Sequence, residues 1–400
     1  MKYPSIDENN YPLGFLFKKG GEQPDIVRGK TGKTTYTTHA RQMALFQKEA
    51  LVQEGYKGSR WRLSSDEGKH LSGTDLAPFP LGFFNAALHC DLTGRIRQFA
   101  KRDTITLDKI DMEVSNFYYM TGSFLKGDAT GHAEPPLIEI SIKANTSAKK
   151  INKVILDALT ASPFIYGYRN KLHSRFSLFI NGTQKILSNL PNCPIEAAED
   201  PFMIYQTTPA PASDGKFMDG IIRKTGEELE GKITKAPTGT TTKIIRNIYG
   251  ESHSTGGAST VIADTVLGLP GMTRFEIGSD EGNNSAPSGL GHLCAGVSFC
   301  FLTQLHRYIE HQKFSISGMR LTQTVDFEVS EENGSQIGKM AAVDTHLYMN
   351  GDTSEEEYER LLELSAKSCY LHATLATPLE PKVEISLNGN NISKLIRNPD

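Results

Sequence analysis

The sequence predicts an α+β fold made of two tandem copies of one unit, because two separate stretches each occur twice. The stretch "RWRLSSDEG" at residues 60–68 returns as "RFEIGSDEG" at 274–282, and "RFSLFING" at 175–182 returns as "KVEISLNG" at 382–389. The second pair has alternating apolar residues followed by Asn-Gly, a pattern typical of a strand that ends in a tight turn. A repeated strand and a repeated loop indicate a duplicated domain.

A third repeated element is a helix that is apolar on nearly every side. The segments "PLGFFNAALHCDLTGRIRQFAKR" (80–102) and "LGHLCAGVSFCFLTQLHRYIEHQ" (290–312) are both apolar in their first halves and turn basic towards their ends. A helix that is apolar all round must be buried on all sides, so we expect one central helix in each copy. Each helix carries a cysteine at the same point, Cys90 in the first copy and Cys300 in the second.

The rest of the unit also occurs twice. Thr146-Ser147 and Thr353-Ser354 precede amphipathic segments, and Ser or Thr at such a place is a natural helix N-cap. Between the two helices of each copy lie alternating segments that are typical of antiparallel strands with one covered face. Each copy is therefore predicted to pack a buried helix against an antiparallel sheet.

The length of 400 residues suits two domains of ordinary size. The stretches "LPNCPIEAAEDP", "TTPAPASDGK" and "KAPTGTTTK" are rich in Pro, Gly, Thr and small polar residues, as linkers are. We therefore predict a first domain at 1–182, a linker at 183–240 and a second domain at 241–400.

The composition argues against several classes of function. A net charge of −3 does not suit a nucleic-acid or membrane-surface protein, and no run approaches the length of a membrane span. Five cysteines without CxxC spacing do not suggest a disulfide scaffold or a four-cysteine zinc site, and His306 and His311 are spaced wrongly for a zinc pair on a helix. We expect no metal, no cofactor and a cytoplasmic setting with reduced thiols.

The cysteine motifs resemble those of the OsmC/Ohr family, the osmotically inducible and organic hydroperoxide resistance proteins. The resemblance rests on "APFPLGFFNAALHC", "APSGLGHLCAGVSFC" and, about seventy residues after the last, "AKSCYLHATL". Members of the family are usually intertwined homodimers with two sites at the dimer interface. The resemblance therefore implies an intramolecular pseudo-dimer of two OsmC-like units, with further homo-oligomers possible.

One feature of the family pattern is missing. Family peroxidases usually carry a Glu shortly before the first cysteine, paired with an Arg over the thiolate. In this chain Gly289 and Leu290 stand at that place before Cys300, and Phe79 and Pro80 before Cys90. If the chain has such a carboxylate at its site, it must come from elsewhere.

The two copies also differ in their thiols. Peroxide reduction by cysteine needs one thiolate to attack oxygen and a second thiol to resolve the sulfenic acid. The second copy has Cys300 and Cys369, whereas the first has Cys90 and, in the place of Cys369, Ser162. We expect one competent site in the second copy and a degenerate one in the first. The alternative is that these cysteines are small buried hydrophobes, as we expect for Cys294 and Cys193.

A buried thiol also needs a positive charge nearby, since burial raises its pKa. The start of its helix lies about 15 Å from Cys300, too far for the helix dipole to act. Two arginines recur in both copies: Arg274, with Arg60 as its counterpart, and Arg307, with Arg97. Arg307 lies two turns after Cys300 on the same helix face. A basic residue at this place is equally typical of the solvent-exposed end of a buried helix.

The repeated Ser-Asp-Glu-Gly phrase offers a substitute for the missing family carboxylate. We expect Glu281 to fill this role and Glu281 or Asp280 to hold Arg274, while Arg60 or Glu67 could reach the Cys300 site from the other half. The same phrase is equally typical of a structural turn, with Asp accepting backbone hydrogen bonds.

Two functions remain open from the sequence. The first is a thiol peroxidase for organic hydroperoxides that uses an external thiol reductant, with an apolar cleft between the halves lined by Phe299, Phe301 and Phe83 or Phe84. The second is a non-catalytic, stress-related module that binds small apolar ligands and has kept the fold without the chemistry.

Overall fold

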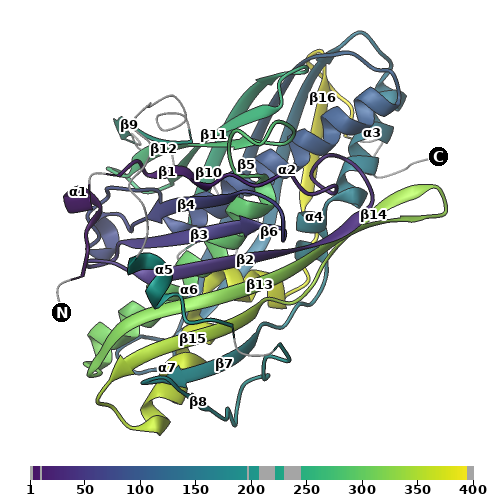
Figure 1. Ribbon diagram of the computed structural model, residues 1–400. Coiled ribbons are helices and arrows are strands. Elements are labelled where there is room, and N and C mark those ends of the chain that lie inside the picture. The colour runs from purple at the N-terminus through teal and green to yellow at the C-terminus, as the bar shows by residue number, and fades with distance from the viewer. Residues whose placement is uncertain (1–2, 10, 196–197, 207–220, 229–244, 394–400) are drawn as a thin grey trace.

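The computed structural model describes residues 3–9, 11–195, 198–206, 221–228 and 245–393 (Figure 1). The helices are α1 (Ile6–Asn9), the 3₁₀ helix η1 (Lys69–Leu71), α2 (Pro80–Arg102), α3 (Ala148–Ala161), α4 (Pro163–Arg169), α5 (Phe202–Gln206), α6 (Gly289–Gln312), α7 (Glu355–Ser368) and α8 (Tyr370–Ala376). The strands are β1 (Gly14–Lys18), β2 (Gly32–Gln42), β3 (Lys48–Glu54), β4 (Arg60–Ser65), β5 (Leu107–Thr121), β6 (Thr130–Ala144), β7 (Arg175–Ile180), β8 (Thr183–Lys185), β9 (Ile222–Glu228), β10 (Arg246–Thr255), β11 (Thr260–Leu267), β12 (Thr273–Asp280), β13 (Ile316–Glu332), β14 (Ser335–Met340), β15 (Asp344–Gly351), β16 (Lys382–Leu387) and β17 (Asn390–Asn391). The α+β prediction is confirmed.

In the described part of the chain the strands form two large sheets, and each sheet combines strands from both halves. The first, here called sheet A, has the order β1-β4-β3-β2-β13-β15-β7-β8, with β14 beside β13. The second, sheet B, has the order β17-β16-β6-β5-β10-β11-β12-β9. Figure 1 shows β4, β3, β2, β13 and β15 running side by side, with the colours of the two halves adjacent.

Long antiparallel ladders join the two halves in both sheets. In sheet A, β2 pairs with β13 from Arg41 opposite Arg320 to Gly32 opposite Val329. In sheet B, β10 pairs with β5 over a ladder of similar length. Two parallel pairs also join the halves: β15 pairs with β7 in sheet A, and β16 pairs with β6 in sheet B. This interleaving of halves is the arrangement that the pseudo-dimer expectation requires.

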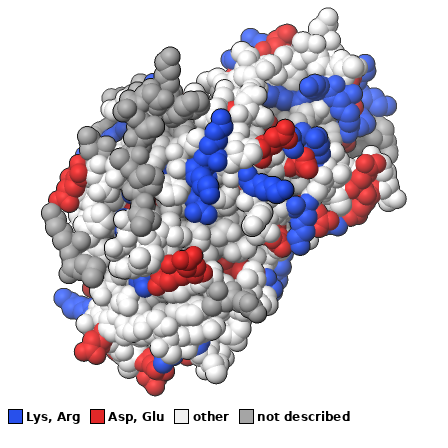
Figure 2. All heavy atoms as spheres, in the orientation of Figure 1, with Lys and Arg blue, Asp and Glu red and all other residues white. Residues whose placement is uncertain are grey.

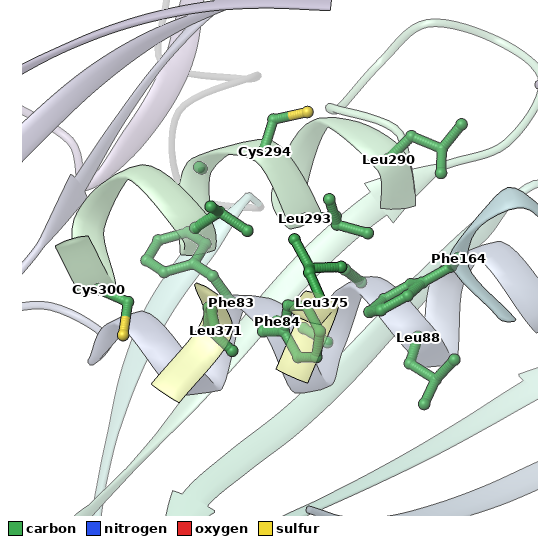
Figure 3. Packing of buried hydrophobic residues seen from close by; sticks show 14 of the residues in the cluster. Phe83, Phe84, Leu88, Phe164, Leu290, Leu293, Cys294, Cys300, Leu371 and Leu375 are labelled. Carbon is green, nitrogen blue, oxygen red and sulfur yellow. The ribbon is translucent and has the colours of Figure 1, made fainter. Parts of the chain in front are cut away.

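The two long helices lie between the sheets and pack against each other. Helix α2 covers strands of sheet B, and α6 covers β2, β3 and β13 of sheet A. Small residues bring the helices close: a side chain at Gly296 would come within 3.1 Å of the backbone of Phe84 and Pro80. Phe83 and Phe299 fill the contact, with ring centroids 5.3 Å apart (Figure 3). The central helices of the two halves thus share one apolar core.

The second helix of each copy begins as predicted but breaks before its end. Ser147 caps α3 and Ser354 caps α7, each accepting a hydrogen bond from a backbone N–H three residues on. Each helix then stops at a residue with extended backbone, Ser162 in the first copy and Cys369 in the second, which also caps the next short helix. The break places these two residues at equivalent bends of the chain.

The region predicted to be a linker contains regular structure. Strand β9 pairs with β12 at the edge of sheet B, and α5 places Tyr205 in a buried position where its hydroxyl donates to the carbonyl of His39. Residues 196–197, 207–220 and 229–240 of the predicted linker lie outside the described residues. The division into two domains and a linker stays a prediction.

Charged side chains of both signs interleave on the face drawn in Figure 2, with basic residues denser towards the end that carries α3. None of the described helices is both long enough and apolar enough to cross a lipid bilayer.

Candidate functional site

Cys300 and Cys369 lie in direct contact in the second half. Helix α6 carries Cys300 near its middle, and the bend between α7 and α8 carries Cys369. The two sulfur atoms are 3.3 Å apart, with the Cys369 thiol donating to Cys300 Sγ, and both side chains are at most 2% exposed. A disulfide is about 2.05 Å long, so a shift of little more than about 1 Å would let the sulfurs bond.

A small cavity opens beside Cys300. Its volume is about 40 Å³, which is room for a few water-sized groups. Residues of both halves line it: Glu67, His70, Leu71, Phe79, Pro80, Leu81, Arg246, Ile248, Leu267, Cys300, Thr303, Gln304, Arg307 and Tyr370. The site therefore lies where the two halves meet.

The first half contributes the carboxylate of this cavity. Glu67 follows β4, and its Oε1 accepts a hydrogen bond of 2.6 Å from the hydroxyl of Thr303, one turn beyond Cys300 on α6. Lys48 of β3 lies 3.5 Å from the same oxygen. Of the two Ser-Asp-Glu-Gly phrases, the one in the opposite half thus lies at the Cys300 cavity.

Two guanidinium groups line the cavity. Arg307 of α6 lies over the ring of Phe124, with 3.7 Å from its central carbon to the ring centroid, and donates to Gln304 at 3.3 Å. Arg246, the first residue of β10, was not among the sequence candidates. Burial raises the pKa of the Tyr370 hydroxyl, while Arg246 and Arg307, together with a hydrogen bond from Arg246, act in the opposite direction.

Arg246 was not predicted because no arginine recurs at its place in the first copy. Trp61 and Phe275 are equivalent in the repeated phrase, and strand pairing relates them through Val52 and Thr265 to Thr38 of β2 and Gly250 of β10. Four residues earlier on each strand, Thr34 therefore occupies in the first copy the place that Arg246 occupies in the second.

The surroundings of Cys300 favour its neutral thiol over the thiolate. Burial raises its pKa well above the usual value, and the hydrogen bond and the charge of Cys369 raise it further, as does Glu67. The backbone N–H of Leu371 acts in the opposite direction. A reactive thiolate at Cys300 thus requires that its proton be removed in the course of the reaction.

The first-half site has different chemistry. Burial also raises the pKa of Cys90. The hydroxyl of Ser162, which stands in the place of Cys369, donates to the carboxylate of Asp91. Asp91 in turn pairs with Arg95 at 2.9 Å, and both side chains are buried. Ser162 is thus part of a buried polar cluster.

Glu281, the predicted substitute for the family carboxylate, lies at the first-half site. Its Oε1 accepts a hydrogen bond of 2.7 Å from the backbone N–H of Gly289. A side chain added at Gly94 of α2 would collide with the Glu281 side chain at 2.8 Å. The assignment of Glu281 to Cys300 is therefore corrected, because the strand exchange carries each Ser-Asp-Glu-Gly loop to the opposite copy's helix.

Arg274 also lies away from the thiols. It forms ion pairs with Glu251 at 2.6 Å and Asp264 at 3.0 Å on neighbouring strands. These acids, not Asp280 or Glu281, hold its guanidinium. The expectation that Arg274 activates Cys300 is corrected for this reason.

The counterpart Arg60 donates to the side chain of Gln53 at 3.1 Å and does not line the Cys300 cavity. Cys294 is buried on another side of α6, and Figure 3 shows its side chain pointing away from that of Cys300. Cys193 lies in the loop after β8, with its sulfur 3.9 Å from the His346 ring.

The aromatic cleft expected from the sequence is absent from the described part of the site. Phe83, Phe84, Phe299 and Phe301 are all fully buried in the core. Phe83 and Phe299 contact each other between the two long helices, whereas Phe84 packs against α4 and Phe301 against β7 and α8. The apolar walls of the Cys300 cavity come instead from Leu71, Phe79, Leu81, Ile248 and Leu267. The four rings were wrongly assigned because they face other parts of the core.

Among the described residues no group of three or more His, Cys, Asp and Glu side chains is arranged to hold a metal ion.

Comparison with known proteins finds similarity in the part of the chain that contains Cys300 and Cys369. The family model of the OsmC-like proteins matches residues 282–384. A crystal structure of an OsmC-like hydroperoxide resistance protein from Jannaschia sp. CCS1 is similar at 20% identity over 34% of this chain and 90% of its own, with a TM-score of 0.26. No curated protein matches the chain. Residues 282–384, with Cys300 and Cys369 among them, form an OsmC-like domain.

Proposed function

We propose that the protein is a thiol-dependent peroxidase that reduces organic hydroperoxides at Cys300 and resolves the product with Cys369. The observation that carries this proposal is the 3.3 Å contact between the two sulfur atoms beside a cavity lined by two arginines. A pair of buried thiols in contact, next to a cavity with cationic groups, is suited to two-electron thiol chemistry.

The reaction balances with the groups at hand. Cys300 loses its proton and attacks the distal oxygen of ROOH, which breaks the O–O bond and gives Cys300 sulfenic acid and, with that proton, ROH. The Cys369 thiol then attacks the sulfenic sulfur, forming the disulfide and releasing water. An external thiol reductant supplies the two electrons and two protons that restore both thiols.

The charged residues of the cavity have separate roles in this scheme. Arg246 and Arg307 stabilise the developing thiolate and the departing alkoxide, since fixed donors act most strongly in a site shielded from water. Glu67 is a positioning residue, because its carboxylate is bound to Thr303 and lies beside Lys48. It replaces, from the other half, the carboxylate that the family usually carries before its first cysteine.

The cavity volume bears on the substrate. About 40 Å³ holds the peroxide group itself and little else. An alkyl chain must therefore displace a wall residue, and the short η1 segment with His70 and Leu71 is the wall supplied by a loop. We assign this reaction to one site for each chain, in a reducing compartment such as the cytoplasm, where the five free cysteines stay reduced.

A non-catalytic binding module is the second candidate, and one observation favours it. The pKa of Cys300 is raised, whereas a working peroxidatic cysteine is usually activated by a lowered one. The alkylation rate of Cys300 with iodoacetamide, followed against pH with and without a hydroperoxide analogue such as tert-butyl alcohol, separates the two. A rate that rises only at alkaline pH under all conditions supports the binding module.

The proposal is tested by stopped-flow consumption of cumene hydroperoxide with dithiothreitol as reductant. Cys300→Ser should abolish consumption, and without dithiothreitol Cys369→Ser should allow a single turnover that leaves a sulfenic acid, detectable by mass after dimedone labelling. Cys90→Ser, at the equivalent position of the other copy, is the matched control and should keep the full rate. Equal rates in all four proteins would refute the peroxidase.

A further inference from the structure

A cavity of about 610 Å³ lies at the first-half site, where the second half has only the small cavity of Cys300. It is bordered by the second half of α2, by the β10–β11 hairpin at residues 256–259, and by Glu281. Gly94, Arg97 and Glu281 line it, and these are the equivalents of Gln304, Arg307 and Glu67 at the Cys300 cavity. The two cavities thus lie at the same part of the repeated unit, but their volumes differ greatly.

Small residues of the bordering hairpin, Gly256, Gly257 and Ala258, leave this space open, and a side chain at Gly257 would meet no atom within 4 Å. At Gly94, where α6 carries Gln304, the Glu281 side chain takes up the space instead. In the other copy the equivalent β2–β3 hairpin carries Phe46, whose ring packs edge-on against His306 at 4.5 Å. The two hairpins therefore differ in how much volume their side chains fill.

The cavity presents uncompensated positive charge. Arg97 donates to the carbonyl groups of Thr255 at 2.9 Å and Thr260 at 3.4 Å, and its Nε is buried without a hydrogen-bond partner. Neither Arg97 nor Lys101 forms an ion pair with any residue that the structure describes. The charge of Asp280 also acts on Arg97, but it forms no ion pair with it. Two cations on one wall, neither of them in an ion pair with a described residue, attract an anion.

Glu281 does not neutralise these cations near neutral pH. Burial raises its pKa to about 8, and the charge of Asp91 contributes, against a smaller opposite effect of the Gly289 N–H. Glu54 raises this pKa further, while Arg95 lowers it. With Oε1 accepting from Gly289, the protonated carboxyl group has its other oxygen available as a donor towards the cavity.

We propose that this first-half cavity binds a small carboxylate with a short apolar chain, its charged end held by Arg97 and Lys101. The guanidinium group matches the planar carboxylate, and the protonated Glu281 can donate to it as well. Ala100, Ile105 and Leu107 give the cavity an apolar floor for the chain. The volume is in the range of small-molecule sites. This binding is independent of the peroxidase chemistry.

Isothermal titration with hexanoate tests the proposal, with hexanol as a neutral probe and inorganic phosphate as a second anion. Wild type should bind one hexanoate for each chain and should not bind hexanol. Arg97→Gln should weaken hexanoate binding by about tenfold or more, since it removes a charged hydrogen bond. Lys149→Gln, which removes an exposed positive charge outside the cavity, is the matched control and should leave binding unchanged.

A second variant fills the cavity without changing any charge. A side chain at Gly257 would meet no atom within 4 Å, so Gly257→Leu should fold normally and obstruct hexanoate. Cys300→Ser should bind hexanoate like wild type, and binding should weaken as pH rises through about 8, when Glu281 ionises. The proposal is overturned if hexanoate fails to bind, if phosphate binds as well as hexanoate, or if binding survives in both Arg97→Gln and Gly257→Leu.

Discussion

The two sites of this chain occupy equivalent places in the repeated unit but contain different chemistry. At the second-half site the bend between two helices presents the thiol of Cys369 to Cys300, and Arg246 lies at the adjoining strand end. At the first-half site the same bend presents Ser162, which is bound to Asp91, and the strand carries Thr34. The resolving thiol and the strand arginine are both replaced, so the first half lacks two parts of a redox site at once.

The two sites also differ in the volume and the walls of their cavities. The second-half site has bulky and charged walls around about 40 Å³, whereas the first-half site has a small-residue hairpin beside an open cavity of about 610 Å³. Each site still receives a glutamate from the opposite half, Glu67 or Glu281. The shared sheets thus fix which loop reaches which helix, while the side chains at a few equivalent positions decide between reaction and binding.

The largest expected effect comes from giving the second-half site the residue of the first. Arg246→Thr removes a guanidinium group from the Cys300 cavity, and loss of one such donor costs about 10²–10³ in rate. We expect kcat/KM for cumene hydroperoxide to fall by that factor, measured by stopped flow. Thr34→Val, at the equivalent position of the first copy, is the control and should keep the wild-type rate.

A structural role for Arg246 gives a different result. If the residue only supports the fold, Arg246→Thr lowers the thermal midpoint and Arg246→Lys restores both midpoint and rate. If the guanidinium acts on the thiolate, Arg246→Thr also shifts the pH at which Cys300 is alkylated to higher values. An unchanged rate in Arg246→Thr contradicts the assignment of this residue.

A smaller effect is expected on stability at the first-half site. The pKa of Glu281 is about 8 in the folded protein and about 4.5 when unfolded, so the folded state holds the proton more tightly. The stability that this proton contributes is complete below pH 4.5 and is lost as pH rises through 8. Between pH 5 and 9 the free energy of unfolding of wild type should therefore fall by roughly 1–3 kcal/mol relative to that of Glu281→Gln.

Urea denaturation at several pH values measures this difference. Glu54, whose pKa burial raises to about 7, titrates in both proteins, so some slope remains in the variant. Glu356→Gln, on the exposed start of α7, serves as control and should follow wild type. Parallel curves for wild type and Glu281→Gln would show that Glu281 is ionised in the folded state.

Much of the fold could be predicted because its signals are local or repeated. The buried helices were placed to within a residue, since an all-apolar face needs no knowledge of its partner. The turns were predicted because Asn-Gly favours positive φ, and Asn181 and Asn388 both adopt it. The position of Cys369 at a helix end followed from the same repeat.

The site could be predicted only in part, because its charges depend on pairing between distant strands. Arg246 lies at the Cys300 cavity through the register of β10 with β5, and no local pattern specifies that register. Arg274 was assigned wrongly for the same reason, since Glu251 and Asp264 reach it across neighbouring strands. Recurrence in both copies did identify Glu67 and Arg307 at the cavity, whereas Arg246 and Cys369, which are unique to one copy, distinguish its site.

The smallest expected effect concerns the N-terminal caps of α3 and α7, the second helices of the two copies. Ser354 forms a reciprocal capping box with Glu357 and opens a turn of acidic residues, which suits the positive end of the helix dipole. Ser147 makes only the single bond to the N–H of Lys150. Ser354→Ala should therefore cost about 1 kcal/mol and Ser147→Ala about half of that, measured by urea denaturation. Equal costs would mean that packing, and not the cap, sets where these helices begin.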